Sequence, residues 1–150
     1  MTDERITLTT AKLCKEKNFN IGCNGSYTEF FKTHKSDNPS FAMKKGEVEF
    51  DGSFYFINNN QSCDYSNEKF IMYAAPTQAL LQRWLREKHN LHIEILLGHD
   101  EKETWYDFYI YKIELGYDYE FLIDSGEIEM RNSYEECLEA GLFEALNLIK

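Results

Sequence analysis

The sequence predicts one α+β domain in which helices cover one face of an antiparallel sheet. A chain of 150 residues suffices for a single core, and no long linker divides it. Apolar residues recur with helical spacing in three segments and alternate with polar residues in several others. The first half, residues 1–75, is expected to be rich in strands, whereas residues 76–150 run in the order helix, strands, helix.

The elements of the first half are predicted from caps and turns. A short helix ends at Lys17, with Thr9 or Thr10 at its start as the cap. Glycines and a proline leave the structure of residues 18–39 undecided. Asp51-Gly52 favours a two-residue hairpin turn, because both central positions of that turn need a positive φ angle. The strands expected around it are residues 47–50, 53–57 and 69–74, and residues 58–67 are expected to form a polar loop.

Two amphipathic helices frame the second half. Thr77 starts the first helix, which carries Trp84 in its apolar stripe and ends near Asn90. Ser133 starts the second helix as part of an S-x-x-E capping box, and this helix is expected to bury Cys137. The segments between the two helices are predicted as strands at residues 92–97, 105–115, 118–124 and 127–131, with a charged turn at residues 98–103.

The strand predicted at residues 105–115 is rich in aromatic side chains. Alternation places Trp105, Tyr109 and Tyr111 on one side of it, and Tyr106 and Phe108 on the other. If both helices cover one face of the sheet, rings stay exposed on the other face. Tyr109 and Tyr111 would then offer a platform on which a nucleotide-like small molecule stacks. The alternative is a strand that packs between the two halves of the protein.

Negative charge is concentrated toward the C-terminus. Residues 1–97 are neutral overall, whereas residues 98–150 carry the whole formal charge of −10. Along residues 118–124, Tyr119, Phe121 and Ile123 are predicted to point inward, which leaves the carboxylates between them on one solvent face. This acidic face suits docking to a host protein with a basic surface, by imitation of nucleic acid or a similar mode, and it equally suits solubility alone. The expected contacts are Glu120, Asp124, Glu127, Glu129 and Glu139, with Tyr117 or Trp105 as an exposed anchor.

Other functions lack the residue patterns that they need. A pI of about 4.8 argues against direct nucleic-acid binding. His89 and His92 have no metal-ligand partners at suitable spacing, and Cys63 lies in a polar loop without a motif that holds a nucleophile. We therefore expect no enzymatic activity, metal or cofactor. The sequence is compatible with a homo-oligomer. Without a signal peptide or a membrane span, we expect a cytoplasmic location and four reduced cysteines.

Two stretches of the second half resemble a known lineage. Residues 75–95 contain P-T-Q-A-L-L-Q-R-W-L-R-E, and residues 133–150 contain Y-E-E-C-L-E-A-G. Both motifs are similar to those of small accessory proteins encoded by phages and prophages of gut Bacteroidetes. The motifs are structural, so the resemblance implies no catalytic residue. It implies a phage accessory protein in the bacterial cytoplasm, with counter-defence as one role.

Overall fold

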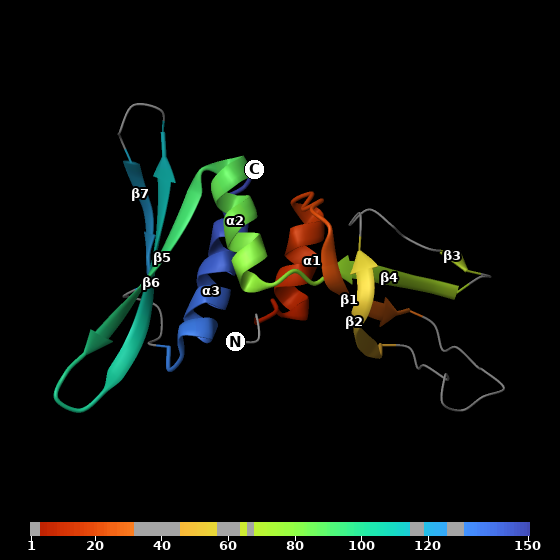
Figure 1. Cartoon of the computed structure of the whole chain (residues 1–150), viewed down its shortest axis with the longest axis horizontal. Helices are drawn as coiled ribbons and strands as arrows, with labels where there is room; N and C mark the ends of the chain where they lie inside the picture. Colours follow the sequence, from red (N-terminus) through yellow and green to blue (C-terminus); the bar gives the residue numbers. More distant parts are fainter. Residues whose placement is uncertain (1–3, 32–45, 57–63, 66–67, 115–118, 126–130) are drawn as a thin grey trace.

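The computed structural model describes residues 4–31, 46–56, 64–65, 68–114, 119–125 and 131–150. These ranges contain three helices and seven strands, and the strands form two antiparallel sheets. The chain is therefore α+β, as predicted, although its strands are divided between two sheets instead of forming one (Figure 1).

The first half of the chain contains α1 (Leu8–Glu16) and a four-stranded sheet. The strands, whose order in the sheet is β2-β1-β4-β3, are β1 (Cys23–Phe30), β2 (Val48–Phe56), β3 (Asp64–Tyr65) and β4 (Glu68–Ala74). Lys12 of α1 forms an ion pair with Glu29 of β1, with 2.8 Å between Nζ and Oε2. Residues 18–39, which the sequence leaves undecided, include β1, and β1 is a central strand because it lies between β2 and β4.

Two predictions for the first half are wrong. α1 is capped by Thr7 and not by Thr9 or Thr10, since the Thr7 hydroxyl accepts a hydrogen bond from the Thr10 amide. Residues 51–52 form no hairpin turn, because β2 runs through them as a single strand. Both parts of β2 pair with β1, and a shift in register accommodates the additional residues. Of the polar loop predicted at residues 58–67, residues 64–65 form the short strand β3, and the rest lies outside the described residues.

The second half contains α2 (Gln78–His89), α3 (Tyr134–Asn147) and a three-stranded sheet. The strands pair in the order β5-β6-β7 and are β5 (Leu91–His99), β6 (Thr104–Ile113) and β7 (Tyr119–Asp124). The predicted helix boundaries are confirmed. Thr77 and Ser133 are the N-caps, and Asn90 ends α2 in the left-handed conformation with a φ of 55°. The strand predicted at residues 127–131 lies outside the described residues except for Arg131.

Both halves contribute to one hydrophobic core. α2 and α3 cover one face of the β5-β6-β7 sheet, and α1 packs against α3 (Figure 1). Phe19 of the first half makes an edge-to-face contact with Trp84 of α2, with ring centroids 5.2 Å apart. Cys137 is fully buried in this core, as predicted. No helix in the described ranges is long and apolar enough to cross a bilayer.

Candidate functional site

The β5-β6-β7 sheet turns one face toward α2 and α3, and no other helix or strand of the described residues lies over its second face (Figure 1). We call this second face the outer face. Its apolar side chains include Phe121 and Tyr119, which are 49% and 70% exposed. A contiguous exposed apolar patch is typical of an interaction surface. The outer face consists of His92, Glu94, Leu96, Gly98, Trp105, Asp107, Tyr109, Tyr111, Ile113, Tyr119, Phe121 and Asp124.

A β-bulge in β7 determines which of its side chains reach the outer face. Phe121 and Ile123 pair with consecutive residues of β6, so Leu122 between them has no cross-strand partner. Leu122 and Ile123 both pack against the core, whereas Phe121 and Tyr119 are exposed. The prediction that Tyr119, Phe121 and Ile123 all point inward is therefore wrong for the first two, because the extra residue reverses the alternation.

The bulge also separates acidic residues that the sequence predicts on one surface. Glu120 pairs with Lys112 on the helix-covered side of the sheet. Asp124 pairs with Tyr109 on the outer face. The predicted common face for Glu120 and Asp124 is therefore wrong. Three further predicted contacts, Glu127, Glu129 and Tyr117, lie outside the described residues.

Aromatic rings form a continuous group across β6 and β7 on the outer face. The ring centroid of Phe121 lies 5.9 Å from that of Tyr109 and 5.7 Å from that of Tyr111. Trp105 lies over Gly98 of β5, where a Cβ atom would come within 2.4 Å of the indole ring. Trp105, Tyr109 and Tyr111 thus share one side of β6, as predicted. This side faces away from the helices, so the alternative of a strand packed between the two halves is wrong.

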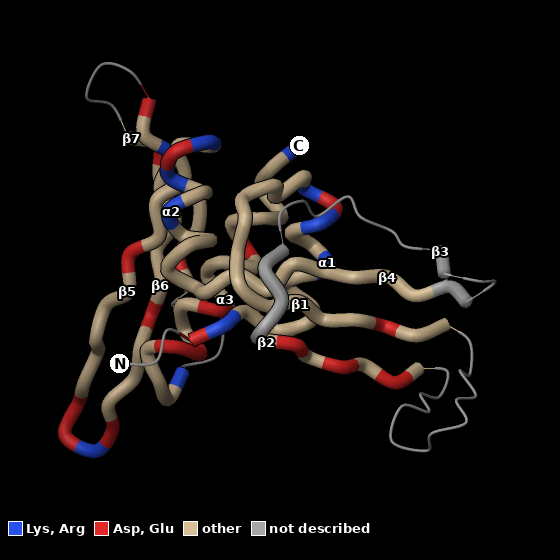
Figure 2. Tube along the Cα trace, turned by 45° about the vertical axis from the view of Figure 1, so that its right-hand side comes forward, with Lys and Arg blue, Asp and Glu red and all other residues tan. Residues whose placement is uncertain are grey.

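Three carboxylates, those of Glu94, Asp107 and Asp124, lie among these rings, and no Lys or Arg belongs to the outer face. Glu94 accepts a hydrogen bond from the Tyr111 hydroxyl at 3.0 Å. Asp107 accepts one from the Trp105 indole at 2.8 Å. Figure 2 shows acidic residues along β5 and β6 and in the hairpin that joins them. The outer face is therefore both aromatic and negatively charged.

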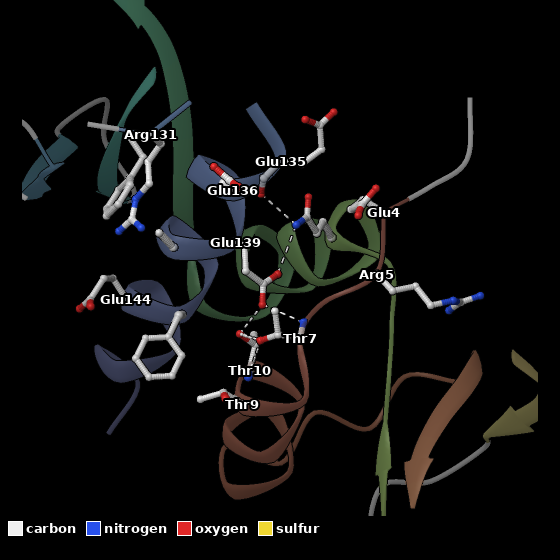
Figure 3. A pocket seen from close by; sticks show the side chains of 14 residues that line it. Glu4, Arg5, Thr7, Thr9, Thr10, Arg131, Glu135, Glu136, Glu139 and Glu144 are labelled. Atoms are coloured by element: carbon white, nitrogen blue, oxygen red, sulfur yellow. Dashed lines mark hydrogen bonds between the residues drawn. The ribbon is translucent and has the colours of Figure 1, made fainter. Parts of the chain in front are cut away.

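A cavity of about 620 Å³ lies where the N-terminal segment meets α3 and β6 (Figure 3). The Oε1 atom of Glu139 accepts hydrogen bonds from the Thr7 amide at 2.8 Å and from the Thr10 hydroxyl at 2.5 Å. The Oε2 atom accepts one from the Gln78 side chain at 3.2 Å. The sequence predicts Glu139 as a partner contact, whereas in the structure its carboxylate connects α1, α2 and α3.

Helix N-termini account for most of the acidic lining of this cavity. α1, α2 and α3 each begin beside it, since Thr7, Gln78 and Glu135 are all among the lining residues. The N-terminal end of a helix carries a partial positive charge, which nearby carboxylates offset. We therefore assign a structural role to the carboxylates of Glu135, Glu136 and Glu139, which lie at these helix starts. The charged residues of the lining are Glu4, Arg5, Arg131, Glu135, Glu136, Glu139 and Glu144.

The other chemical candidates belong to the core or to ordinary surface. The described residues hold no group of three or more His, Cys, Asp or Glu side chains that could bind a metal ion. His89 packs against Trp84, with ring centroids 4.6 Å apart, and burial lowers the pKa of His89. Arg83 of α2 forms an exposed ion pair with Glu87 at 2.8 Å. Cys63 lies outside the described residues.

The outer face brings together four residues that the sequence singles out, namely Trp105, Tyr109, Tyr111 and Asp124. Sequence reasoning missed Glu94, although the strand predicted at residues 92–97 contains it. No family model, no curated protein and no solved structure matches this chain. The outer face is the best-supported candidate site, because it brings exposed rings and carboxylates together on one surface.

Proposed function

We propose that the protein is a non-enzymatic binding protein, and that its outer face docks a partner protein with a basic surface. The supporting observation is a sheet face that no other described helix or strand covers and that combines exposed aromatic rings with three carboxylates. Burial of the rings against a partner would supply affinity. The carboxylates would select a basic partner and speed its association.

The proposed setting is the cytoplasm of a bacterial host. The resemblance of residues 75–95 and 133–150 to phage accessory proteins supports this setting, with a host protein as the partner and counter-defence as the role. Of the acidic contacts predicted from the sequence, Asp124 retains its place in this proposal. Glu94 and Asp107 replace Glu120 and Glu139 as its neighbours on the docking surface.

A second candidate function is sequestration of a nucleotide-like small molecule on the same rings. The contacts among Tyr109, Tyr111 and Phe121 favour it, because bases stack readily on exposed aromatic side chains. The carboxylates of Glu94 and Asp124 oppose it, since they repel the phosphate groups of a nucleotide. The basic protein partner is therefore the better-supported candidate.

Native mass spectrometry of the protein after incubation with lysate of a gut Bacteroidetes host tests the proposal. The test variant is Tyr119→Ser with Phe121→Ser, which changes only exposed side chains of the outer face. The matched control is Leu97→Ser, because Leu97 is 58% exposed but pairs with Tyr106 on the other side of the sheet. We expect wild type and control to retain one basic protein that the double variant loses and that rising salt releases.

Three other outcomes contradict the docking proposal. Retention of the same partner by the double variant would place the contact elsewhere on the molecule. A small-molecule mass increment lost in the double variant would favour sequestration. A dimer of this chain that only the double variant dissociates would make the outer face a self-association surface.

A further inference from the structure

One row of the outer face places an aromatic ring between two acidic residues. Glu94 of β5 pairs with Tyr109 of β6, and Tyr109 pairs in turn with Asp124 of β7. Adjacent strands are about 4.8 Å apart, so the two acidic residues flank Tyr109 at a mutual Cα separation of about 10 Å. We call these three residues the acidic row.

The acidic row has the electrostatics of a cation site. The face of a tyrosine ring attracts a cation through its quadrupole. Asp124 is the cross-strand neighbour of Tyr109 on this face, and its negative charge is the main cause that raises the pKa of Tyr109. Glu94 is held in place by the Tyr111 hydroxyl, and a carboxylate has about four acceptor positions, so the Tyr111 contact leaves Glu94 able to accept further hydrogen bonds.

Apolar side chains border the acidic row on both sides along the strands. Leu96 precedes the row on one side and is 44% exposed, and Phe121 follows it on the other side and is 49% exposed. Leu96 and Phe121 lie on the two strands beside Tyr109, each one strand across and one same-face step along, which is about 8 Å from Tyr109. Alternate side chains of an extended partner segment are about 7 Å apart, so a segment that crosses the three strands obliquely has a similar spacing. Such a segment would place a cationic side chain on the acidic row and apolar side chains on Leu96 and Phe121.

We propose that the acidic row binds an arginine side chain of the partner, with the guanidinium on the Tyr109 ring between Glu94 and Asp124. This inference rests on the proposed docking function and names the group that the outer face recognises. Arginine fits better than lysine, because its planar guanidinium stacks on rings and pairs with carboxylates through two hydrogen bonds. The partner segment is extended and carries this arginine between apolar side chains at alternate positions.

Nuclear magnetic resonance titration with three capped peptides tests the inference. Each peptide has leucines at alternate positions on both sides of a central residue, which is arginine, lysine or citrulline. Citrulline has the shape of arginine without its charge. We expect the arginine peptide to shift resonances of β6 and β7 and to bind at least about tenfold more tightly than the citrulline peptide and severalfold more tightly than the lysine peptide.

Variants of the protein locate the peptide. Glu94→Gln and Asp124→Asn should each weaken binding of the arginine peptide about threefold, as expected for exposed charge pairs. Tyr109→Leu should abolish the preference for arginine over lysine, because it keeps an apolar surface but removes the ring. Glu120→Gln is the matched control, since Glu120 lies on the same strand as Asp124 but on the opposite side of the sheet.

Equal binding of the arginine and citrulline peptides would overturn the inference, as would an equal effect of Glu120→Gln and Asp124→Asn. The lysate experiment then separates this inference from the proposed function. If Tyr119→Ser with Phe121→Ser still loses the host partner, the docking function stands and only the arginine assignment fails. If that variant keeps the partner, both fail.

Discussion

Glu139 shows how much of the tertiary structure depends on a single carboxylate. It accepts hydrogen bonds from α1 at Thr7 and Thr10 and from α2 at Gln78, while belonging to α3. From the sequence it is one of several acidic residues near the start of a helix. Nothing local indicates that a helix cap 132 positions away lies against it. Contacts of this kind are set by the packing of helices and not by the sequence around the residue.

Glu139→Ala is expected to lower the free energy of unfolding by about 2 kcal/mol, because hydrogen-bond donors at the start of α1 lose a charged acceptor. Urea unfolding followed by circular dichroism measures the change. Glu144→Ala is the matched control, since Glu144 lines the same cavity but its side chain makes no hydrogen bond or ion pair within the described residues. Its expected effect is below about 0.5 kcal/mol. Equal losses in the two variants would contradict the structural role of Glu139.

At the scale of the element, helices were predictable and strand details were not. The caps at Thr77, Asn90 and Ser133 are local signals, because the capping side chain and the amide it binds lie within a few residues. Strand pairing depends on distant partners. Asp51-Gly52 has the composition of a hairpin turn, yet pairing with β1 keeps β2 extended through it. The outer face was predictable along β6, where alternation is regular, but not along β7, where Leu122 interrupts it.

The packing of α3 on the sheet depends on Gly141. A Cβ atom there would lie 2.9 Å from Cγ2 of Ile93 and 3.2 Å from Cγ of Phe108. Gly141→Ala is expected to lower the free energy of unfolding by about 1 kcal/mol, since overpacking costs about 1–3 kcal/mol and alanine recovers about 1 kcal/mol of helix propensity. Thermal or urea unfolding measures it.

A double-mutant cycle separates the two effects of Gly141→Ala. In an Ile93→Ala background the crowding methyl group is gone, so the same substitution should stabilise the protein by up to about 1 kcal/mol. A loss of stability that is the same in both backgrounds would show that Ile93 is not the side chain that crowds position 141.

At the scale of the whole molecule, the shared core keeps several groups protonated at alkaline pH. Burial is the main cause that raises the pKa of Cys137 to about 11 and that of Tyr73 to about 12, and it also raises the pKa of Cys14 above its ordinary value of 9.0. The unfolded chain releases the thiol protons near pH 9, whereas the folded chain keeps them. The folded state therefore binds more protons above that pH, and stability falls as pH rises.

We expect the free energy of unfolding to decrease between about pH 8 and pH 10, by up to about 1.4 kcal/mol per pH unit above 9 for each thiol that stays protonated. Urea unfolding at a series of pH values measures the slope. Cys14→Ala should lower stability at every pH, because it leaves a cavity, but it should make the alkaline slope shallower. An unchanged slope in Cys14→Ala would contradict the assignment of that slope to this thiol.

The bulge at Leu122 has a consequence for comparing this chain with relatives of different length. Removing Leu122 would leave every other residue of β7 with its present partner, at the loss of one partly buried side chain. In an alignment, a one-residue gap in this strand therefore belongs at position 122. Such a gap would keep Phe121 and Tyr119 on the surface, so β7 can gain or lose one residue during evolution while presenting the same face.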